Sequence, residues 1–174
     1  MRLCAFLERA AVAAAALTIA AVPVARADDD SGQLIKATLV GFEETPAIIT
    51  PGHGTFRARI ANDGSAIEYE LTFSDLVAPA VAAHIHVGQF DVAGGVAAFL
   101  CGGGGKPSCP AAGGTVTGTI VAADVLGLPA QGLTAGGLDQ LLTAIHAGVT
   151  YVNVHSTAHP GGEIRGQVQA PHGP

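Results

Sequence analysis

The stretch HGTFRARIANDGSAIEYELTF, residues 53–73, decides the fold. Apolar and polar side chains alternate on both sides of Asp63-Gly64, a dipeptide that is typical of two-residue hairpin turns. If Asp63-Gly64 forms the turn, the two halves of the stretch pair as antiparallel strands in a single register. The opposed residues are then Ile60 with Ile67, Arg59 with Glu68, Ala58 with Tyr69, Arg57 with Glu70 and Phe56 with Leu71.

One face of this hairpin is apolar, and the other carries opposite charges on its two strands. Each facing pair of opposite charges contributes about 0.2–1 kcal/mol to a sheet. Because Arg57 and Arg59 have acidic partners in the sequence, the pattern indicates a structural ladder rather than an anion site. The hairpin therefore predicts an antiparallel sheet with one buried face.

The rest of the chain repeats this kind of unit. Short runs of alternating apolar and polar residues are separated by Gly, Pro, Asn and Asp, which is typical of an all-β, Greek-key-like antiparallel sandwich or barrel. We expect about seven to nine strands. Beyond the hairpin, strands are expected at 33–41, 83–87, 95–100, 115–122, 150–155 and 163–169.

One stretch has helical spacing instead. Apolar residues recur at intervals of three and four, with Thr134 near the start and Gly148 beyond the end. The pattern predicts one short helix near 134–147 that covers one end of the sandwich. His146 lies in its last turn, where the helix dipole suits a partial positive charge, and is interpreted as structural. The apolar residues are Leu138, Leu141, Leu142 and Ile145.

The N-terminus has the features of a secretory signal peptide. An arginine-bearing start precedes an apolar stretch from Ala10 to about Val24, and Ala25-Arg26-Ala27 forms a small-x-small cleavage site. Residues 1–27 are therefore expected to be removed on export to a periplasm or to the cell exterior. The remainder is expected to comprise a flexible acidic leader at 28–32, one β domain at 33–170 and a flexible tail at 171–174.

The composition excludes two classes of partner. The chain has a formal net charge of −6, and three of its eight basic residues lie in the expected signal peptide. An acidic domain offers no electrostatic footprint for nucleic acid or for an anionic membrane surface. Beyond the signal peptide, no segment approaches the roughly 18 apolar residues of a membrane span.

Two cysteines remain once Cys4 is removed with the signal peptide. Cys101 and Cys109 flank GGGGKPS, and export places them in an oxidising compartment. A disulfide is therefore expected in preference to free or metal-bound thiols. Closing this loop of nine residues contributes roughly 2.5 kcal/mol on a chain-entropy estimate.

Three of the expected strands carry polar side chains on one face. In AHIHV, YVNVH and GEIRGQ these residues alternate with small or β-branched residues, which must face the core. If the three strands are neighbours in the sheet, their polar residues gather on the face away from the main core. The residues are His84, His86, Asn153, His155, Glu163 and Arg165.

This polar face has three interpretations. A hydrogen-bonded network is favoured, because polar clusters beneath loops are commonly structural. The alternative is a copper or zinc site formed by His84, His86 and His155, with the fourth ligand open. Catalysis is disfavoured, because the sequence has no nucleophile elbow, phosphate-binding loop or paired carboxylates. Candidates for the fourth ligand are His159, His53, Glu43 and water.

The two leading interpretations predict different geometries. In a metal site the ligand nitrogens should lie within about 4 Å of one another, around a point with room for an ion at about 2.0–2.1 Å. Histidine rings that point apart, or that already bond protein groups, favour the network instead. The positions of the ring nitrogens therefore discriminate between the two.

Three segments resemble the CHRD domain, which is named for its occurrence in chordin. They are LVGFEETPAIITPGHGTF, AHIHVGQFDVAGGVAAFLCGG and YVNVHSTAHPGGEIRGQV, in that order and spacing. The resemblance covers nearly the whole mature chain, and YVNVH with GGEIRGQV is its most specific part. It implies a secreted all-β domain that has no established activity of its own.

A weaker similarity is to copper/zinc superoxide dismutase, a Greek-key sandwich with a copper-binding H-x-H pair on one strand and another histidine late in the chain. That similarity implies that His84, His86 and His155 are copper ligands. No histidine lies between His86 and Cys101, however, so the zinc loop and bridging histidine of that family are missing. The similarity supports the fold more than the activity.

The sequence therefore predicts an exported CHRD-like domain that acts as a non-catalytic binding or structural module for an unknown extracytoplasmic ligand. No cofactor is required by this function. Copper or zinc binding is the alternative function, and a superoxide-dismutase-like enzyme is the second alternative.

Overall fold

The computed structural model describes residues 32–171. The expected signal peptide at 1–27, the leader up to residue 31 and the tail beyond residue 171 lie outside the described residues. Within the described part of the chain, no helix is long and apolar enough to cross a membrane.

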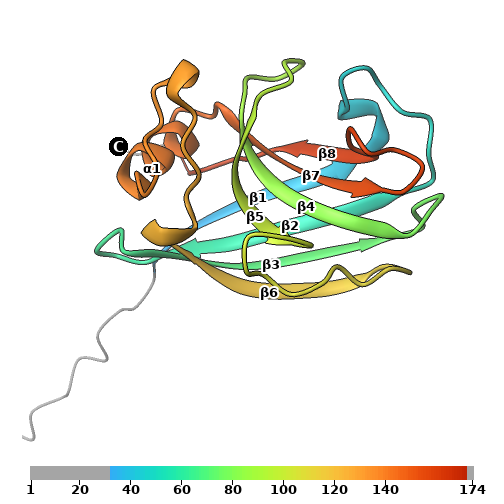
Figure 1. Ribbon diagram of the computed structural model, residues 1–174, viewed down its shortest axis with the longest axis horizontal. Helices are drawn as coiled ribbons and strands as arrows, with labels where there is room; N and C mark the ends of the chain where they lie inside the picture. Colours follow the sequence, from blue (N-terminus) through green and yellow to red (C-terminus); the bar gives the residue numbers. More distant parts are fainter. Residues whose placement is uncertain (1–31, 172–174) are drawn as a thin grey trace, which may run out of the picture.

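Residues 32–171 form eight strands, one α-helix and three short 3-10 helices (Figure 1). The strands are β1 (Gln33–Val40), β2 (His53–Ile60), β3 (Ala66–Ser74), β4 (Ala80–Val87), β5 (Gly95–Cys101), β6 (Gly114–Val121), β7 (Thr150–Ser156) and β8 (Ile164–Gln167). The helices are η1 (Gly41–Glu43), η2 (Ala122–Asp124), η3 (Pro129–Gln131) and α1 (Leu138–His146).

All eight strands belong to one antiparallel sheet in the order β5-β4-β7-β8-β1-β2-β3-β6. The sheet curls until its two edge strands approach each other, which makes a nearly closed barrel (Figure 1). Its interior is filled by apolar side chains such as Phe56, Leu71, Ile85 and Val154, all of which are fully buried. The predicted all-β architecture is confirmed.

The hairpin of β2 and β3 has the predicted register. Arg57 lies opposite Glu70, and Arg59 lies opposite Glu68. The alternation in the sequence is sufficient for this result, because a shift of one residue would turn every apolar side chain of the strand toward solvent.

The turn of this hairpin is wider than predicted. The last backbone hydrogen bond between the strands runs from Ala61 N to Ala66 O, and the Gly64 amide donates to the carbonyl of Ala61. Gly64 adopts a left-handed φ of 69°, which glycine tolerates without steric cost. The loop therefore comprises residues 62–65, and the prediction that Asp63-Gly64 is a two-residue turn is wrong.

Helix α1 lies at one end of the barrel (Figure 1) and is shorter than the predicted 134–147. Gly136 has a left-handed φ of 80°, so the residues before it cannot continue the helix. Thr134 does not cap the helix; its amide and hydroxyl both donate to the side-chain oxygen of Gln140. The predicted apolar face packs inward, and its buried residues are Leu138, Leu141 and Ile145.

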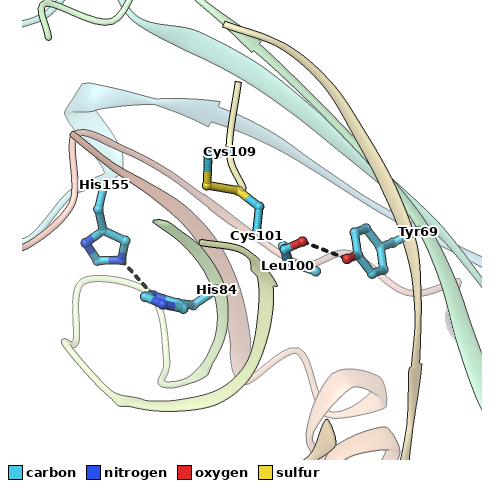
Figure 2. The surroundings of a disulfide bond; sticks show 6 residues. All are labelled: Tyr69, His84, Leu100, Cys101, Cys109 and His155. Carbon is cyan, nitrogen blue, oxygen red and sulfur yellow. Dashed lines mark hydrogen bonds between the residues drawn. A yellow bond between two sulfur atoms is a disulfide. The ribbon is translucent and has the colours of Figure 1, made fainter. Parts of the chain in front are cut away.

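The gap between β5 and β6 is bridged by a tyrosine. The register of β5 against β4 shifts twice, which marks Ala97 and Leu100 as extra residues on β5. Such bulges bend a strand and increase its twist. The Tyr69 hydroxyl on β3 donates to the carbonyl of Leu100 at 2.7 Å (Figure 2), and Leu126 N donates to the carbonyl of Ala97. Both bulged residues thus have a partner for their carbonyl groups.

The predicted disulfide between Cys101 and Cys109 is confirmed, with a Cα–Cα distance of 5.0 Å (Figure 2). The loop that it closes reaches across to β6. The Lys106 ammonium donates to the carbonyl of Thr119 at 2.6 Å and forms an ion pair with Asp124 at 2.9 Å. The loop therefore occupies the free edge of β6, which would otherwise be open to pairing with another chain.

Candidate metal centre

The polar residues predicted to share one face of the sheet do so. Strands β4, β7 and β8 are neighbours, and their register places His84 opposite Asn153 and Asn153 opposite Arg165. All six predicted residues are buried, with exposed fractions of 8% or less. Because the opposite face packs on the core, this part of the sheet is covered on both sides.

Glu163 fastens two of the covering loops. Its Oε1 atom accepts hydrogen bonds from the Thr50 hydroxyl at 2.6 Å and the Val77 amide at 2.7 Å. Burial by itself raises the pKa of Glu163, but hydrogen bonds from Ser156, Thr50 and Val77 outweigh burial and lower the pKa below its ordinary value. The ionised carboxylate therefore holds the loops that contain Thr50 and Val77 against the sheet.

Arg165 fastens a second pair of loops. Its guanidinium donates to the carbonyl of Gln89 at 2.9 Å and to the hydroxyl of Thr45 at 3.3 Å. The same group lies 3.5 Å from the centre of the Tyr151 ring, a cation–π contact that stabilises a buried cation. Glu163 and Arg165 therefore bond the loops that cover this part of the sheet.

Glu44 is a buried carboxyl group that the sequence interpretation missed. Burial raises its pKa to about 7, in spite of the nearby Arg165 charge and hydrogen bonds from Asn153 and Thr45. A Cβ atom at Gly162 would lie 2.3 Å from its Oε1 atom, so only glycine leaves room for this carboxyl group. The residue is part of the EETP run, and nothing in that run distinguishes it from the neighbouring Glu43.

The histidines form a separate group, and two of them have an assignable proton. The Nδ1 atom of His86 lies 3.0 Å from the carbonyl of Gly94, and that of His155 lies 2.9 Å from the carbonyl of Pro160. A carbonyl can only accept, so both Nδ1 atoms carry the proton. In the neutral rings, the Nε2 atoms of His86 and His155 therefore carry a lone pair.

The third histidine bonds the second. His84 Nδ1 lies 2.9 Å from His155 Nε2 (Figure 2). Because His155 Nε2 is the acceptor, His84 Nδ1 must donate in the neutral state, which leaves the lone pair of His84 on Nε2. The Nε2 atoms of His84 and His86 are both buried, and no protein group lies in hydrogen-bonding geometry with them, although the side chain of Asn153 is close enough to His86 to raise its pKa.

All three histidines are held in the neutral form. Burial, followed by the neighbouring His155 and His86, lowers the pKa of His84 to about 3. Burial is also the main cause that lowers the pKa of His86 to about 4, and it lowers that of His155. Neutral imidazole is the form that binds metal ions.

The three rings approach the geometry of a metal site without reaching it. One ligand atom from each histidine can be chosen so that all three lie within 4.8 Å of one another. Two nitrogens that both bind one ion are at most about 4.2 Å apart. The three ring nitrogens would therefore have to move slightly closer together to bind one ion. The 2.9 Å between His84 Nδ1 and His155 Nε2 is a hydrogen-bond distance, so an ion bound through His155 Nε2 would replace this hydrogen bond.

The comparison with protein families agrees with the expected family. The family model described as the CHRD domain matches residues 35–168. The chain belongs to the CHRD domain family. Membership supports a non-catalytic binding or structural module in general terms. No curated protein and no solved structure matches the chain in the corresponding comparisons, so the weaker similarity to superoxide dismutase has no support from them.

In this CHRD domain, aromatic rings hold two of the histidines in place. The Tyr151 ring stacks on His86 with 4.7 Å between centres and an angle of 7°, and Phe99 packs edge-on against His84 at 4.5 Å. Sequence alternation places Tyr151 on the polar face, but the pattern does not indicate the stacking. The aromatic contacts fix the ring planes, which a metal site requires of its ligands.

No fourth protein ligand joins the three histidines within residues 32–171. Of the candidates named from the sequence, His53 is exposed and lies 3.1 Å from the Ser74 hydroxyl. Glu43 accepts a hydrogen bond from the Gln167 amide. An ion bound by the three histidines would therefore have an open coordination position.

The neutral histidines predict a pH dependence of stability for the metal-free CHRD domain. Their pKa values lie below the ordinary 6.5, so between about pH 4 and 6.5 the unfolded chain binds more protons than the folded protein. The free energy of unfolding should therefore fall as the pH falls through this window. Each net proton contributes up to about 1.4 kcal/mol per pH unit.

Glu44 has the opposite effect on the pH dependence of stability, so a substitution of Glu44 serves as the control. Its pKa rises from 4.5 to about 7 on folding, so its contribution to stability is lost as the pH rises through that value. Glu44→Gln should steepen the acid loss of stability. Urea unfolding with a chelator at about pH 5 and about pH 7.5 measures both effects; equal midpoints for the unsubstituted protein would contradict the prediction.

Proposed function

We propose that this CHRD domain is an exported, non-catalytic module that binds one copper or zinc ion through His84, His86 and His155. The observation that carries the proposal is a pair of buried ring nitrogens, Nε2 of His84 and Nε2 of His86, that have no protein partner and belong to a group of three histidines whose ligand atoms lie within 4.8 Å of one another. A buried polar atom without a partner costs about 1–3 kcal/mol. A bound ion would remove that cost.

The groups around the histidines support a metal rather than a purely structural role. The carbonyls of Gly94 and Pro160 accept from the Nδ1–H groups of His86 and His155. A backbone carbonyl on the far nitrogen is the usual arrangement that orients a metal-binding imidazole. Three imidazoles without a thiolate or carboxylate suit copper and zinc.

Binding is favoured over catalysis because two of the three other charged groups in the polar cluster, which also contains Glu44, are already used. Glu163 and Arg165 bond the loops that cover the site. Neither is then available as an acid, base or electrostatic catalyst. The signal sequence and the disulfide support a location in a periplasm or outside the cell, where disulfides persist.

Metal titration of the purified protein tests the proposal. We expect one equivalent of copper or zinc to bind, and His86→Ala to weaken binding by roughly 100-fold or more, because loss of a ligand exceeds the 10- to 100-fold effect of losing an outer-shell partner. Competition with a chromophoric chelator measures the affinity, and elemental analysis measures the stoichiometry.

The matched control is His53→Ala, which removes an exposed histidine outside the group. Its metal affinity should equal that of the unsubstituted protein. Circular dichroism of each variant verifies that it is folded. If His84→Ala and His86→Ala take up as much metal as the control variant, the three histidines are not the site.

A further inference from the structure

A groove lies on the outer surface of the sheet, and none of the three histidines lines it. It has a volume of about 500 Å³ and is lined on its polar side by Lys36, Arg57 and Gln169, and on its apolar side mainly by Leu34 and Pro171. Small-molecule sites commonly have volumes of roughly 300–1,000 Å³. The groove is therefore large enough for a small ligand.

Three chain segments build the groove. The segment after β8 runs beside β1, where Lys36 and Gln169 exchange two backbone hydrogen bonds of 3.1 and 2.8 Å. On the other side, Lys36 lies opposite Arg57 of β2. Residues that are opposed across a sheet point to the same face, so the side chains of Gln169, Lys36 and Arg57 form a row.

The two cations in this row form no ion pair with an acidic residue of the described part of the chain. The predicted charge ladder is therefore present in register, since Glu70 lies opposite Arg57, but it forms no ion pair at Arg57. An exposed cation that is not engaged remains available to a ligand.

The charge here is opposite to that of the protein as a whole. The chain has a formal net charge of −6, yet Lys36 and Arg57 lie side by side and Arg59 follows on the same face of β2. The other two basic residues of the described domain are occupied: Lys106 pairs with Asp124, and Arg165 is buried. The lining of the groove thus places two cations side by side on an acidic protein, with Glu70 opposite Arg57 on the next strand.

The apolar side of the groove limits the kind of anion. Leu34 is 59% exposed, and it lies beside Pro171 in the lining. Covering an exposed leucine contributes about 25 cal/mol per Å² of apolar surface buried. Inorganic phosphate or acetate would leave this surface in water, whereas an anion with an aliphatic chain would cover it.

We propose that the groove binds a small aliphatic carboxylate. The carboxylate lies between the Lys36 ammonium and the Arg57 guanidinium, which presents paired N–H donors that match two carboxylate oxygens. The aliphatic chain lies over Leu34 and Pro171. This site is separate from the histidines and does not depend on the proposed metal function.

Binding of three probes to the purified protein tests the assignment. Octanoate carries the charge and the chain, 1-octanol lacks the charge, and acetate lacks the chain. Calorimetry or chemical-shift titration should give the tightest binding for octanoate, with each of the other two weaker by roughly tenfold, because each loses one of the two contributions. Equal binding of octanol and octanoate would overturn the proposal.

Variants that remove charges in the groove provide a second test of the proposed carboxylate site. Lys36→Gln combined with Arg57→Gln should weaken octanoate binding by roughly tenfold, since both positions are at the surface and partly screened. Glu70→Gln removes the negative charge opposite Arg57 and should strengthen binding. Lys106→Gln, away from the groove, is the matched control. If the double variant binds octanoate as tightly as this control, the cations do not form the site.

Discussion

Replacing Arg165 with methionine should lower the free energy of unfolding by roughly 3 kcal/mol, a large part of the about 5–15 kcal/mol that stabilises a typical domain. The side chain is 2% exposed. Its loss leaves the carbonyl of Gln89 and the hydroxyl of Thr45 without their donor. Thr45 and Gln89 are themselves exposed, so the cost arises from the lost hydrogen bonds to a charged group, which contribute about 1.5–3 kcal/mol each.

The substitution also changes two other contributions to the free energy of unfolding, and these partly cancel. Methionine removes the cost of burying a guanidinium, which is itself large. It also removes the cation beside Glu44, whose pKa should then rise above its present value of about 7. The carboxyl group becomes protonated and leaves no unpaired charge. The lost hydrogen bonds to the loops therefore dominate the result.

Urea unfolding measures the change, and Arg57→Met is the matched control. Arg57 is exposed and forms no ion pair in the described domain, so its replacement should change stability by no more than about 0.5 kcal/mol. Amide hydrogen exchange should also become faster in residues 41–52 and 88–94 of the Arg165 variant. Equal stability of the two variants would show that Arg165 does not anchor these loops.

Removing the disulfide should have an effect of similar size. Replacing Cys101 and Cys109 with alanine restores the chain entropy of the closed loop, which corresponds to roughly 2.5 kcal/mol. The loop also carries Lys106, which bonds the carbonyl of Thr119 and pairs with Asp124. Because Cys101 is fully buried, alanine is preferable to serine, which would bury an unpaired hydroxyl.

Lys106→Met separates the two contributions of the loop. It removes the bonds to Thr119 and Asp124 but keeps the disulfide, and it should cost only about 1 kcal/mol because the ion pair is near the surface. Thermal or urea unfolding of both variants gives the comparison. If the double alanine variant is no less stable than Lys106→Met, the covalent link adds nothing beyond positioning Lys106.

The strands and their register could be predicted because the information is local. In β2 and β3 each apolar residue is two positions from the next, and only one register buries them all. The turn and the start of α1 were predicted less well. Both depend on single glycines, Gly64 and Gly136, whose left-handed conformation is compatible with several turn types.

The candidate site could be predicted as a list of residues but not as a geometry. Alternation placed His84, His86, Asn153, His155, Glu163 and Arg165 on one face, and the structure brings them together. Glu44 was missed, because it lies in a loop without periodicity. Whether the histidines bind an ion stays a prediction, and so does the role of the expected signal peptide.

The sequence by itself determined the all-β class, the register of the two hairpin strands and the disulfide. It also determined which residues share one polar face of the sheet. These follow from a period of two and, for the disulfide, from two cysteines in a chain that is expected to be exported. Only the tertiary structure decided which ring nitrogens carry lone pairs and that Glu163 and Arg165 bind loops instead of histidines. It also decided that Arg57 forms no ion pair within residues 32–171. The reason is that these properties depend on atoms of loops distant in the chain, which meet the sheet only after it has curled into a barrel.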